Sequence, residues 1–381
     1  MNTPVPTFTQ RPRIAIVGGG PGGLTLAALL ERHGWTSAVF DADTAADARD
    51  QGGTLDLHPN EGQVALAKAG LLDAFMAVAR HDDQEERLLD PATAAVLREE
   101  IPEPGTGQRP EIDRLVLRRL LLDAIAPGTV RWGARVREVV DHPAGGHGLR
   151  LDDGLAGPFD LVVGADGAWS RVRRALTPVM PIYTGVTFVE FWLSEVDQRH
   201  PALARLVGHG TMFALGDGKG VIAQRNGGGT IRAYAAFHRE LSADERTGIP
   251  ATIDRAEVLA RFEGWAVPLR ALIAEADRLA AVRPIMALPP SLDWAARAGL
   301  TVIGDAAHVM PPLGTGVNLA MLDAAELGEA LVAADEWEAG VAAFESAMLA
   351  RARRVSLECQ QGFSDMFGVG GAQRAQDLAP R

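Results

Sequence analysis

Short runs of apolar residues, each followed at once by glycine, recur at three places along the chain. They cover residues 14–17 (Ile-Ala-Ile-Val), 161–163 (Leu-Val-Val) and 300–303 (Leu-Thr-Val-Ile). Unbroken runs of this length are typical of strands that are buried on both faces of a parallel sheet. Because the carboxyl ends of parallel strands meet at one edge of the sheet, we expect the three turns to approach a ligand there.

Helical and extended patterns alternate from residue 13 to about residue 175. In this part the pattern predicts a helix ending near His33 and Gly34, a strand over 37–40, a helix over 113–126, and strands near 135–140 and 149–151. Such alternation favours an α/β architecture.

Between residues 183 and 238 the pattern changes to strand-like runs separated by glycine-rich turns. The runs cover 186–193, 211–215, 220–224 and 230–237, which indicates an antiparallel sheet. The α/β pattern returns after Gly299, with a helix from about 316 to 333 and a long helix from about 336 to 361. We therefore predict a discontinuous Rossmann-like domain (1–180 and 290–335), an inserted antiparallel-sheet substrate domain (181–289) and a C-terminal helical segment (336–381).

Composition and charge narrow the class of protein. The 381 residues are 47% hydrophobic and 23% charged, with a formal net charge of −12. An acidic chain is a poor match for nucleic acid or an anionic membrane, and no apolar run is long enough to span a bilayer. The single cysteine, Cys359, cannot form an internal disulfide, so we expect a cytoplasmic protein with Cys359 buried on a helix. The nine histidines lack the spacing of metal ligands, and no metal is expected.

The turn after the first apolar run has the glycine spacing of a dinucleotide-binding fingerprint, Gly18-Gly19-Gly20-Pro21-Gly22-Gly23. The first glycine permits a tight turn, the third lets the backbone approach a pyrophosphate, and the last lets helix and strand pack closely. The helix N-terminus adds free N–H groups and a partial positive charge. An acid at the end of the next strand can accept hydrogen bonds from an adenosine ribose. The cofactor-binding residues expected here are Gly18, Gly20, Gly22, Gly23 and Asp41; the alternative is a glycine-rich turn without a ligand.

Three signatures stand in a fixed order: this fingerprint, Gly164-Ala165-Asp166-Gly167, and Gly304-Asp305-Ala306-Ala307-His308. In this order the chain resembles the group A FAD-dependent aromatic hydroxylases, which are single-component FAD monooxygenases. Segments 52–58, 110–114 and 304–312 are also similar to the tetracycline-inactivating monooxygenases. The resemblance covers roughly residues 13 to 330 and implies a Rossmann-like FAD-binding domain of the GR2 type.

The resemblance implies that NADPH binds transiently to reduce FAD, and that O2 then forms a C4a-hydroperoxyflavin that transfers one oxygen to an electron-rich carbon. The implied substrate is a small phenolic or polycyclic aromatic molecule, in antibiotic resistance or natural-product tailoring. Because the flavin carries the chemistry, no catalytic side chain is expected. We expect a monomer or weak dimer. A flavin-dependent reductase or dehydrogenase, or a halogenase, on the same fold is the alternative, although the W-x-W-x-I-P motif of tryptophan halogenases is absent.

The resemblance also assigns residues to the cofactor. Arg49 and Asp56 flank the Gly52-Gly53 turn, and equivalent family positions hold the mobile flavin and receive NADPH. Arg114 is expected to contact FAD, whereas Arg118, four residues later, is expected to form a surface salt bridge. Asp166 is expected to serve FAD and the approach of NADPH, with Ser170 and Arg173 on a following helix.

The third signature is expected to lie against the flavin. Asp305 would accept a hydrogen bond from a ribityl or ribose hydroxyl, the alternative being a helix N-cap. A helix then opens in the segment Gly314-Thr315-Gly316-Val317-Asn318, and its free N–H groups would face the flavin O2 and N1 edge. The cofactor-binding residues expected in this segment are Gly314, Gly316, Val317 and Asn318.

Substrate-contacting side chains are expected on the inserted sheet and the C-terminal helix. The candidates are Phe191, Trp192, Met212, Phe213, Gln224, Arg232, Met366 and Phe367, and core packing is the alternative for most of them. Where the tetracycline-inactivating enzymes carry an Arg and a His for the drug, this chain has Gly210 and Arg232. We therefore expect weak or no turnover of tetracycline.

Overall fold

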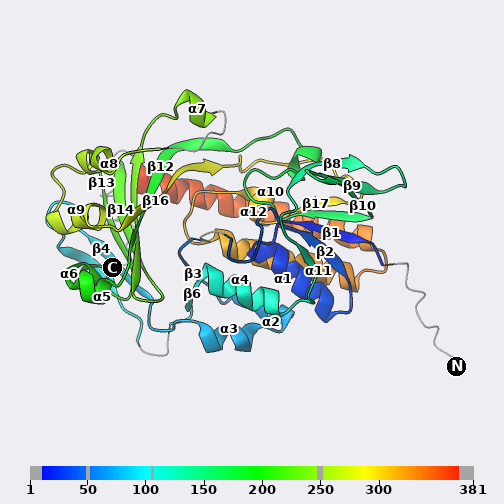
Figure 1. Cartoon of the computed structure of the whole chain (residues 1–381), viewed down its shortest axis with the longest axis horizontal. Coiled ribbons are helices and arrows are strands. Elements are labelled where there is room, and N and C mark those ends of the chain that lie inside the picture. Colours follow the sequence, from blue (N-terminus) through cyan, green and yellow to red (C-terminus); the bar gives the residue numbers. More distant parts are fainter. Residues whose placement is uncertain (1–10, 49–51, 104–106, 247–251, 369–381) are drawn as a thin grey trace.

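The computed structural model describes residues 11–48, 52–103, 107–246 and 252–368, and it contains two domains joined along a long helix (Figure 1). The N-terminal region and the chain after residue 290 form an α/β domain. A large sheet from the middle of the chain forms the second domain. The last helix, α12 (Trp337–Phe367), runs between them.

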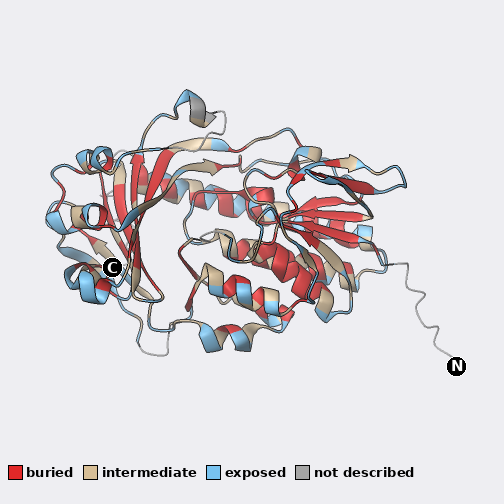
Figure 2. Ribbon diagram, viewed as in Figure 1, coloured by how far each residue is buried: buried red, intermediate tan, exposed pale blue. Residues whose placement is uncertain are grey.

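The first domain is built on a five-stranded parallel sheet. Its strands, in spatial order, are β17 (Leu300–Val302), β11 (Leu161–Gly164), β1 (Ile14–Val17), β2 (Ser37–Phe40) and β7 (Val130–Arg131). All residues of β1, β11 and β17 are buried, as the unbroken apolar runs predicted (Figure 2). The three glycine turns therefore leave the sheet on neighbouring strands and at one edge.

Helices and small sheets complete this domain. The helix α1 (Pro21–Arg32) packs on α11 (Gly316–Ala333), with α4 (Arg114–Asp123), α2 (Gly62–Ala69) and α3 (Leu72–Val78) beside them. A three-stranded antiparallel sheet is formed by β8 (Val136–Asp141), β9 (His147–Leu151) and β10 (Gly154–Phe159), and a two-stranded one by β3 (Thr54–Asp56) and β6 (Glu111–Asp113). Two short helical elements, η1 (Arg173–Ala175) and α10 (Asp305–His308), follow β11 and β17.

The second domain is a seven-stranded sheet. Its spatial order is β16 (Arg278–Ala287), β12 (Ile182–Leu193), β15 (Thr230–His238), β14 (Lys219–Asn226), β13 (Gly210–Gly216), β4 (Glu85–Leu89) and β5 (Val96–Glu100). The predicted antiparallel strands are all present. The last two strands at one edge, β4 and β5, however, come from residues 85–100, inside the segment predicted for the first domain, and β4 pairs with β13 in parallel. The structural sheet is thus larger than the predicted segment 181–289.

The two faces of this sheet have different neighbours. On the outer face, side chains including Val189, Phe191 and Met212 pack against helices in one apolar core. These helices are α5 (Val196–Arg199), α6 (Pro201–Val207), α8 (Arg255–Arg261) and α9 (Val267–Ala274), while α7 (Ala243–Arg246) lies apart from this core. The inner face is turned toward the first domain and toward the end of α12.

The C-terminal helices match the pattern closely. The helix α11 has the predicted bounds, and α12 extends six residues beyond the predicted end at residue 361. Cys359 is buried on α12, as predicted. Over the residues that the structure describes, no helix is both long and apolar enough to cross a membrane.

Candidate active site

The glycine fingerprint leaves β1 in a conformation that only glycine tolerates. Gly18 has φ of 109°, and a Cβ there would lie 2.2 Å from the carbonyl oxygen of Ala165. A Cβ on Gly23 would lie 2.0 Å from the carbonyl oxygen of Gly18. At Gly20, by contrast, nothing lies within 4 Å of such a Cβ, and no side chain caps the helix that starts there. The turn is therefore tight where strands and helix pack, and open where a phosphate would approach.

Asp41, at the carboxyl end of β2, holds the fingerprint turn. Its Oδ2 accepts a hydrogen bond from the backbone N–H of Gly19 at 2.7 Å, and its Oδ1 accepts from the N–H of Asp43 at 2.7 Å. The guanidinium of Arg118 lies 3.3 Å from Oδ2 of Asp41 and 2.9 Å from Oδ2 of Asp43. Arg118 is only 3% exposed. Its salt bridge is therefore buried, and the expected surface location was wrong.

Two charged side chains, Arg114 and Asp305, are close enough to interact electrostatically, and Arg114 also interacts with Glu190 of the large sheet. Among the described residues, neither the carboxylate of Asp305 nor the guanidinium of Arg114 has a hydrogen-bond or ion-pair partner. Burial raises the pKa of Asp305 and lowers that of Arg114, and the two charges act on each other. Asp305 caps neither α10 nor α11, so the N-cap alternative does not account for its position. As far as the described residues go, both groups are therefore available to a ligand.

The start of α11 lies beside Asp305. We call residues 304–315 the flavin loop. Leu319 is the first residue whose N–H bonds back to this loop, at Thr315, and no side chain caps the helix. The N–H groups of residues 316–318 are thus free at a helix N-terminus, where a partial positive charge favours an electron-rich ligand edge.

The side chain of Asn318 is fully buried and bonds only to backbone. Its Nδ2 donates to the carbonyl oxygens of Asp56 at 2.9 Å and Gly314 at 3.2 Å, and its Oδ1 accepts from the N–H of His58 at 2.8 Å. Asn318 therefore joins the end of β3 to the flavin loop.

Asp56 lies at this junction, and His58 is held between two acids. The ring nitrogens of His58 lie 3.0 Å from Asp56 and 3.0 Å from Glu61. These hydrogen bonds raise the pKa of His58 to about 9, so the imidazole carries a positive charge at neutral pH.

Glu111 pairs with Asp56 in the two-stranded sheet. Burial raises the pKa of Glu111 to about 7, although Thr54 donates a hydrogen bond to the Glu111 carboxylate. Arg49 lies outside the described residues.

Asp166 shapes the turn after β11. Its Oδ2 accepts a hydrogen bond from the N–H of Arg171 at 2.6 Å, its Oδ1 is buried without a partner in the described structure, and burial raises its pKa. The predicted helix after it is only a turn followed by η1. Arg173 is fully buried there and donates to the carbonyl oxygens of Ala306 and Ala168, both at 2.7 Å. Arg173 thus ties this turn to α10.

The inner face of the large sheet presents two rows of side chains across neighbouring strands. The register places Trp192, Arg232 and Gln224 opposite one another in one row. Glu190, Tyr234, Ile222 and Phe213 form the next row. Four of the predicted substrate residues, Trp192, Phe213, Gln224 and Arg232, therefore share the face that looks toward Arg114.

Phe191 and Met212 were predicted on this face, and the structure corrects both. Each is 0% exposed within the outer core against α6, α8 and α9. The physical reason is the two-residue period of a strand: Phe191 neighbours Trp192, and Met212 neighbours Phe213, so one member of each pair must face outward.

A buried charge cluster around Glu190 was not predicted from the sequence pattern. The carboxylate of Glu190 is 1% exposed and accepts from the guanidinium of Arg232 and, at 2.9 Å, from Nε of Arg283. Arg232 also stacks on the ring of Trp192, at 4.2 Å from the centroid. The side chain of Arg283 is 53% exposed. Arg232 is therefore held in a buried ion pair with Glu190, whereas the side chain of Arg283 is accessible to solvent and to a ligand.

Tyr234 connects this face to the first domain. A Cβ on Gly53 would lie 3.2 Å from the Tyr234 hydroxyl and 3.3 Å from Cδ of Arg232, so the Gly53 turn lies directly against the sheet. Burial raises the pKa of Tyr234 to about 12, with Glu190 adding to the shift. Arg114 and Arg283 both act on this hydroxyl. The strand period, two residues after Arg232, was the signal that could have identified Tyr234.

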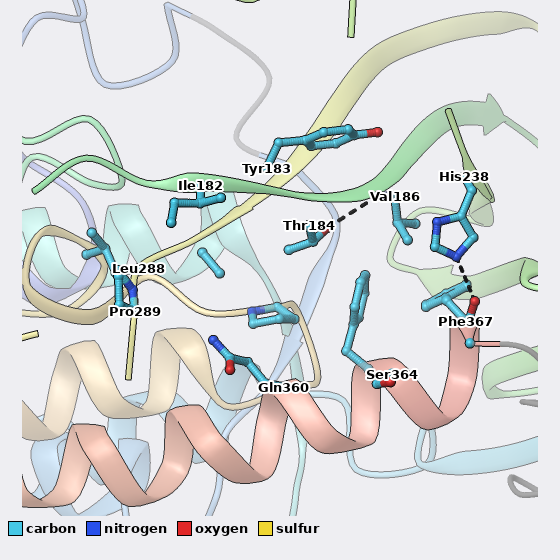
Figure 3. Close-up of a pocket in the computed structure, with 14 residues that line it drawn as sticks. Ile182, Tyr183, Thr184, Val186, His238, Leu288, Pro289, Gln360, Ser364 and Phe367 are labelled. Atoms are coloured by element: carbon cyan, nitrogen blue, oxygen red, sulfur yellow. Dashed lines mark hydrogen bonds between the residues drawn. The ribbon is translucent and has the colours of Figure 1, made fainter. Parts of the chain in front are cut away.

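The end of α12 covers the rest of the inner face. Phe367 and Phe363 contact Phe188, with ring centroids 5.7 and 6.3 Å away, and Met366 packs into the same cluster. A cavity of about 380 Å³ lies between α12, the start of β12 and the end of β16, and Phe363 is among the residues that line it (Figure 3). Phe367 lines this cavity, and its carbonyl oxygen lies 2.7 Å from Nε2 of His238.

No metal site is visible in the described parts of the chain, where no three His, Cys, Asp or Glu side chains gather around one point. The residues present fit a dinucleotide flavin instead. Among the described residues, the groups that suit such a molecule are the open approach at Gly20, the N–H groups of residues 316–318, and the side chains of Arg114 and Asp305, which have no ion-pair partner there.

Comparison with known proteins agrees with this geometry. A family model described as "FAD binding domain" matches residues 11–360. The chain is 30% identical to monooxygenase asqM of Emericella nidulans, over 94% of this chain and 98% of that protein. It is 32% identical to 3-amino-4-hydroxybenzoate 2-monooxygenase PtmB3 of Streptomyces platensis, over 97% and 92%.

Solved structures show the same fold. HpxO of Klebsiella pneumoniae, complexed with FAD and uric acid, superposes with a TM-score of 0.79 at 24% identity, covering 96% of this chain and 93% of that one. A salicylate hydroxylase substrate complex superposes with a TM-score of 0.75 at 20% identity, covering 97% and 93%. With the family match spanning nearly the whole chain, the protein belongs to the FAD-binding-domain family of FAD-dependent aromatic hydroxylases and monooxygenases, and it is an FAD-dependent monooxygenase.

Proposed function

We propose that this monooxygenase uses NADPH and hydroxylates a phenolic or polycyclic aromatic substrate held between the flavin loop and the inner face of the large sheet. The observation that carries the proposal is the meeting of Arg114 and Asp305 with Tyr234, Glu190 and Arg283 around one space. Groups from both domains contribute, so a substrate there would lie against the flavin.

When bound, FAD would accept electrons from the nicotinamide and activate O2, and O2 would be the source of the oxygen atom that is transferred. The chain's own residues bind and orient. Asp305 and the N–H groups of residues 316–318 would hold the ribityl and pyrimidine parts of FAD, and the glycine fingerprint would hold its pyrophosphate. The apolar cluster between the inner face and α12, which includes Phe188, Ile222 and Phe363, would exclude water from the reacting carbon.

The charges favour a substrate with an acidic phenol or a carboxylate. Three arginines (Arg114, Arg232 and Arg283) and two acids (Glu190 and Asp305) meet around the space, which leaves one net positive charge. Arg232 is one of the predicted substrate contacts, but its charge is balanced by Glu190. We assign the anchoring role to the accessible Arg283, with the Tyr234 hydroxyl as a neutral hydrogen-bonding partner.

Tetracycline is a poor match for this site. A Cβ on Gly210 would lie 2.0 Å from the carbonyl oxygen of Glu85, because β4 pairs alongside β13 at this point. The position cannot hold the larger drug-binding side chain without moving β4. With Arg232 bound to Glu190, both polar anchors of the tetracycline-inactivating enzymes are missing or committed, which supports a different aromatic substrate.

The test uses the purified FAD-loaded protein with a panel of phenols, hydroxybenzoates, anthraquinones and tetracyclines. We expect stimulated NADPH consumption with acidic phenols, O2 uptake matching product, and a product heavier by one oxygen. Parallel assays with NADH decide the choice of nicotinamide, and sedimentation decides between monomer and weak dimer. Efficient oxygenation of tetracycline, or product formation without O2 uptake, would contradict the proposal.

A further inference from the structure

A single buried acid, Asp323 of α11, joins three elements beside the flavin loop. It is 0% exposed. Its Oδ2 accepts hydrogen bonds from the N–H of Gly304 at 2.9 Å and from Nε2 of His308 at 2.6 Å. Its Oδ1 accepts from Nη2 of Arg351, on α12, at 2.8 Å. One carboxylate thus contacts both ends of the four-residue helix α10 and the C-terminal helix.

Two of the three partners of the Asp323 carboxylate, His308 and Arg351, are basic side chains. Burial acts to raise its pKa, but His308, the N–H of Gly304 and Arg351 together lower it below the ordinary value. Burial acts to lower the pKa of His308, yet Asp323 raises it above the ordinary value. A carboxylate buried without partners would be strongly unfavourable, so the imidazolium and the guanidinium are what allow Asp323 to remain ionised.

Asp305 lies between the two points that Asp323 holds. Gly304 precedes it and His308 ends the same short helix. Gly304 has φ of 59°, and a Cβ there would lie 2.7 Å from Cβ of Ala320, so α11 packs directly against this turn. The backbone of Asp305 is therefore fixed on both sides while its carboxylate stays free. The free carboxylate is the group that would meet FAD.

We propose that Asp323 and Arg351 are positioning residues for FAD: through Gly304 and His308 they set where the Asp305 carboxylate stands, and they tie that position to α12. The same helix carries Phe363 and Phe367, which cover the inner face of the large sheet. The C-terminal helix thus belongs to the flavin site as well as to the substrate wall. This inference rests on FAD binding by the family fold and not on the identity of the substrate.

The chain offers a matched control on the same arginine. Arg351 also pairs with Glu326 of α11, at 2.7 Å, and the side chain of Glu326 is 32% exposed. None of the hydrogen bonds or ion pairs of Glu326 in the described structure reaches residues 304–308. Loss of Glu326 removes a salt bridge between the same two helices without touching the turn that holds Asp305.

The experiment titrates apoprotein with FAD, following quenching of flavin fluorescence, and records the visible circular dichroism of the bound flavin. For Asp323→Asn and Arg351→Met we expect the Kd for FAD to rise by about tenfold or more, which corresponds to about 1.4 kcal/mol per tenfold. We also expect an altered flavin dichroism. Arg351→Lys should restore most of the affinity, and Glu326→Gln should stay within about twofold of the parent.

A merely structural role gives a different result. It would lower the thermal midpoint of the variants while the folded fraction binds FAD with the parent Kd and the parent dichroism, and that outcome overturns the proposal. An equal loss of affinity in Glu326→Gln also overturns it, because the effect would then follow from general helix contact. If Asp323→Asn does not fold, the FAD affinities of Arg351→Met and Arg351→Lys decide between a positioning role and a merely structural one.

Discussion

The amide of Asn318 binds the carbonyl oxygen of Asp56 at 2.9 Å, so the first turn of α11 and the end of β3 are held together although 262 residues separate them in the chain. The same amide satisfies Gly314 and the N–H of His58. Removing a fully buried amide that makes hydrogen bonds to three backbone groups lowers the free energy of unfolding more than removing an amide at the surface.

Asn318→Ala should lower the free energy of unfolding by about 2–4 kcal/mol, because several buried backbone groups lose their partner. Urea denaturation of apoprotein measures the change. The control is Gln63→Ala, since the Gln63 amide also bridges two carbonyl oxygens, those of Leu57 and Gln108, but is partly exposed. An effect of Asn318→Ala no larger than that of the control would contradict this account.

Asp305→Ala should weaken FAD binding without unfolding the protein. A hydrogen bond from a cofactor hydroxyl to a carboxylate contributes roughly 1.5–3 kcal/mol, which is about a 10- to 150-fold change in Kd. Asp305 makes no cap and no ion pair in the described structure, so its loss leaves the turn intact. Equilibrium dialysis with FAD measures the Kd, and Asp293→Ala, on a nearby loop, is the control. Parent-like affinity would exclude Asp305 from the flavin site.

Stability should fall as pH rises from about 4.5 to about 7 through Glu111. Its ordinary pKa is 4.5 and burial raises the value in the folded protein to about 7. Between these values the folded state binds more protons than the unfolded state, so the contribution is complete below pH 4.5 and is lost as pH rises through 7. One group gives a slope of up to about 1.4 kcal/mol per pH unit.

Glu111→Gln should flatten this part of the stability curve, because glutamine keeps the shape and does not titrate. Chemical denaturation at a series of pH values measures the slope. Glu138→Gln, an exposed substitution, should leave it unchanged. A parent-like slope in Glu111→Gln would show that another group titrates in this window.

Arg283 and Arg232 should respond differently to the same substitution. Arg283→Met should raise the KM for an anionic phenolic substrate by about tenfold, with stability little changed, because its side chain is half exposed. Arg232→Met should lower the free energy of unfolding by about 3–5 kcal/mol, because it leaves Glu190 buried beside one remaining cation. Steady-state kinetics and denaturation, with Arg205→Met on the outer helix α6 as control, separate the two. A large loss of stability in Arg283→Met, together with a raised KM and little loss of stability in Arg232→Met, would show that the two arginines have the opposite roles.

The parts of the fold that carry an unbroken apolar run were predictable, and the parts that carry charge were not. β1, β2 and α11 were placed at their observed bounds because each has a strong period or a glycine boundary. β4 reads Glu-Glu-Arg-Leu-Leu and β5 reads Val-Leu-Arg-Glu-Glu. Neither strand has a clear apolar alternation, and β5 is an edge strand with mostly exposed residues, so nothing local assigns them to the large sheet.

The candidate site was predictable at the glycine turns but less so on the sheet. A period of two residues shows that Trp192 and Phe191 lie on opposite faces, but not which face looks at the flavin. That choice depends on α8 and α9, which pack on the side of Phe191. The buried position of Arg118 depends likewise on Asp41 and Asp43, which only the folded chain brings to it.

The parallel pairing of β4 with β13 limits how this enzyme can be recombined with its relatives. A chimera that exchanges residues 181–289 as one cassette would receive five strands of the sheet and keep the recipient's own two strands at the β4–β5 edge. The foreign residue opposite Glu85 would then have to be as small as Gly210. The large sheet is therefore built from two separate stretches of sequence, and a successful graft must carry both.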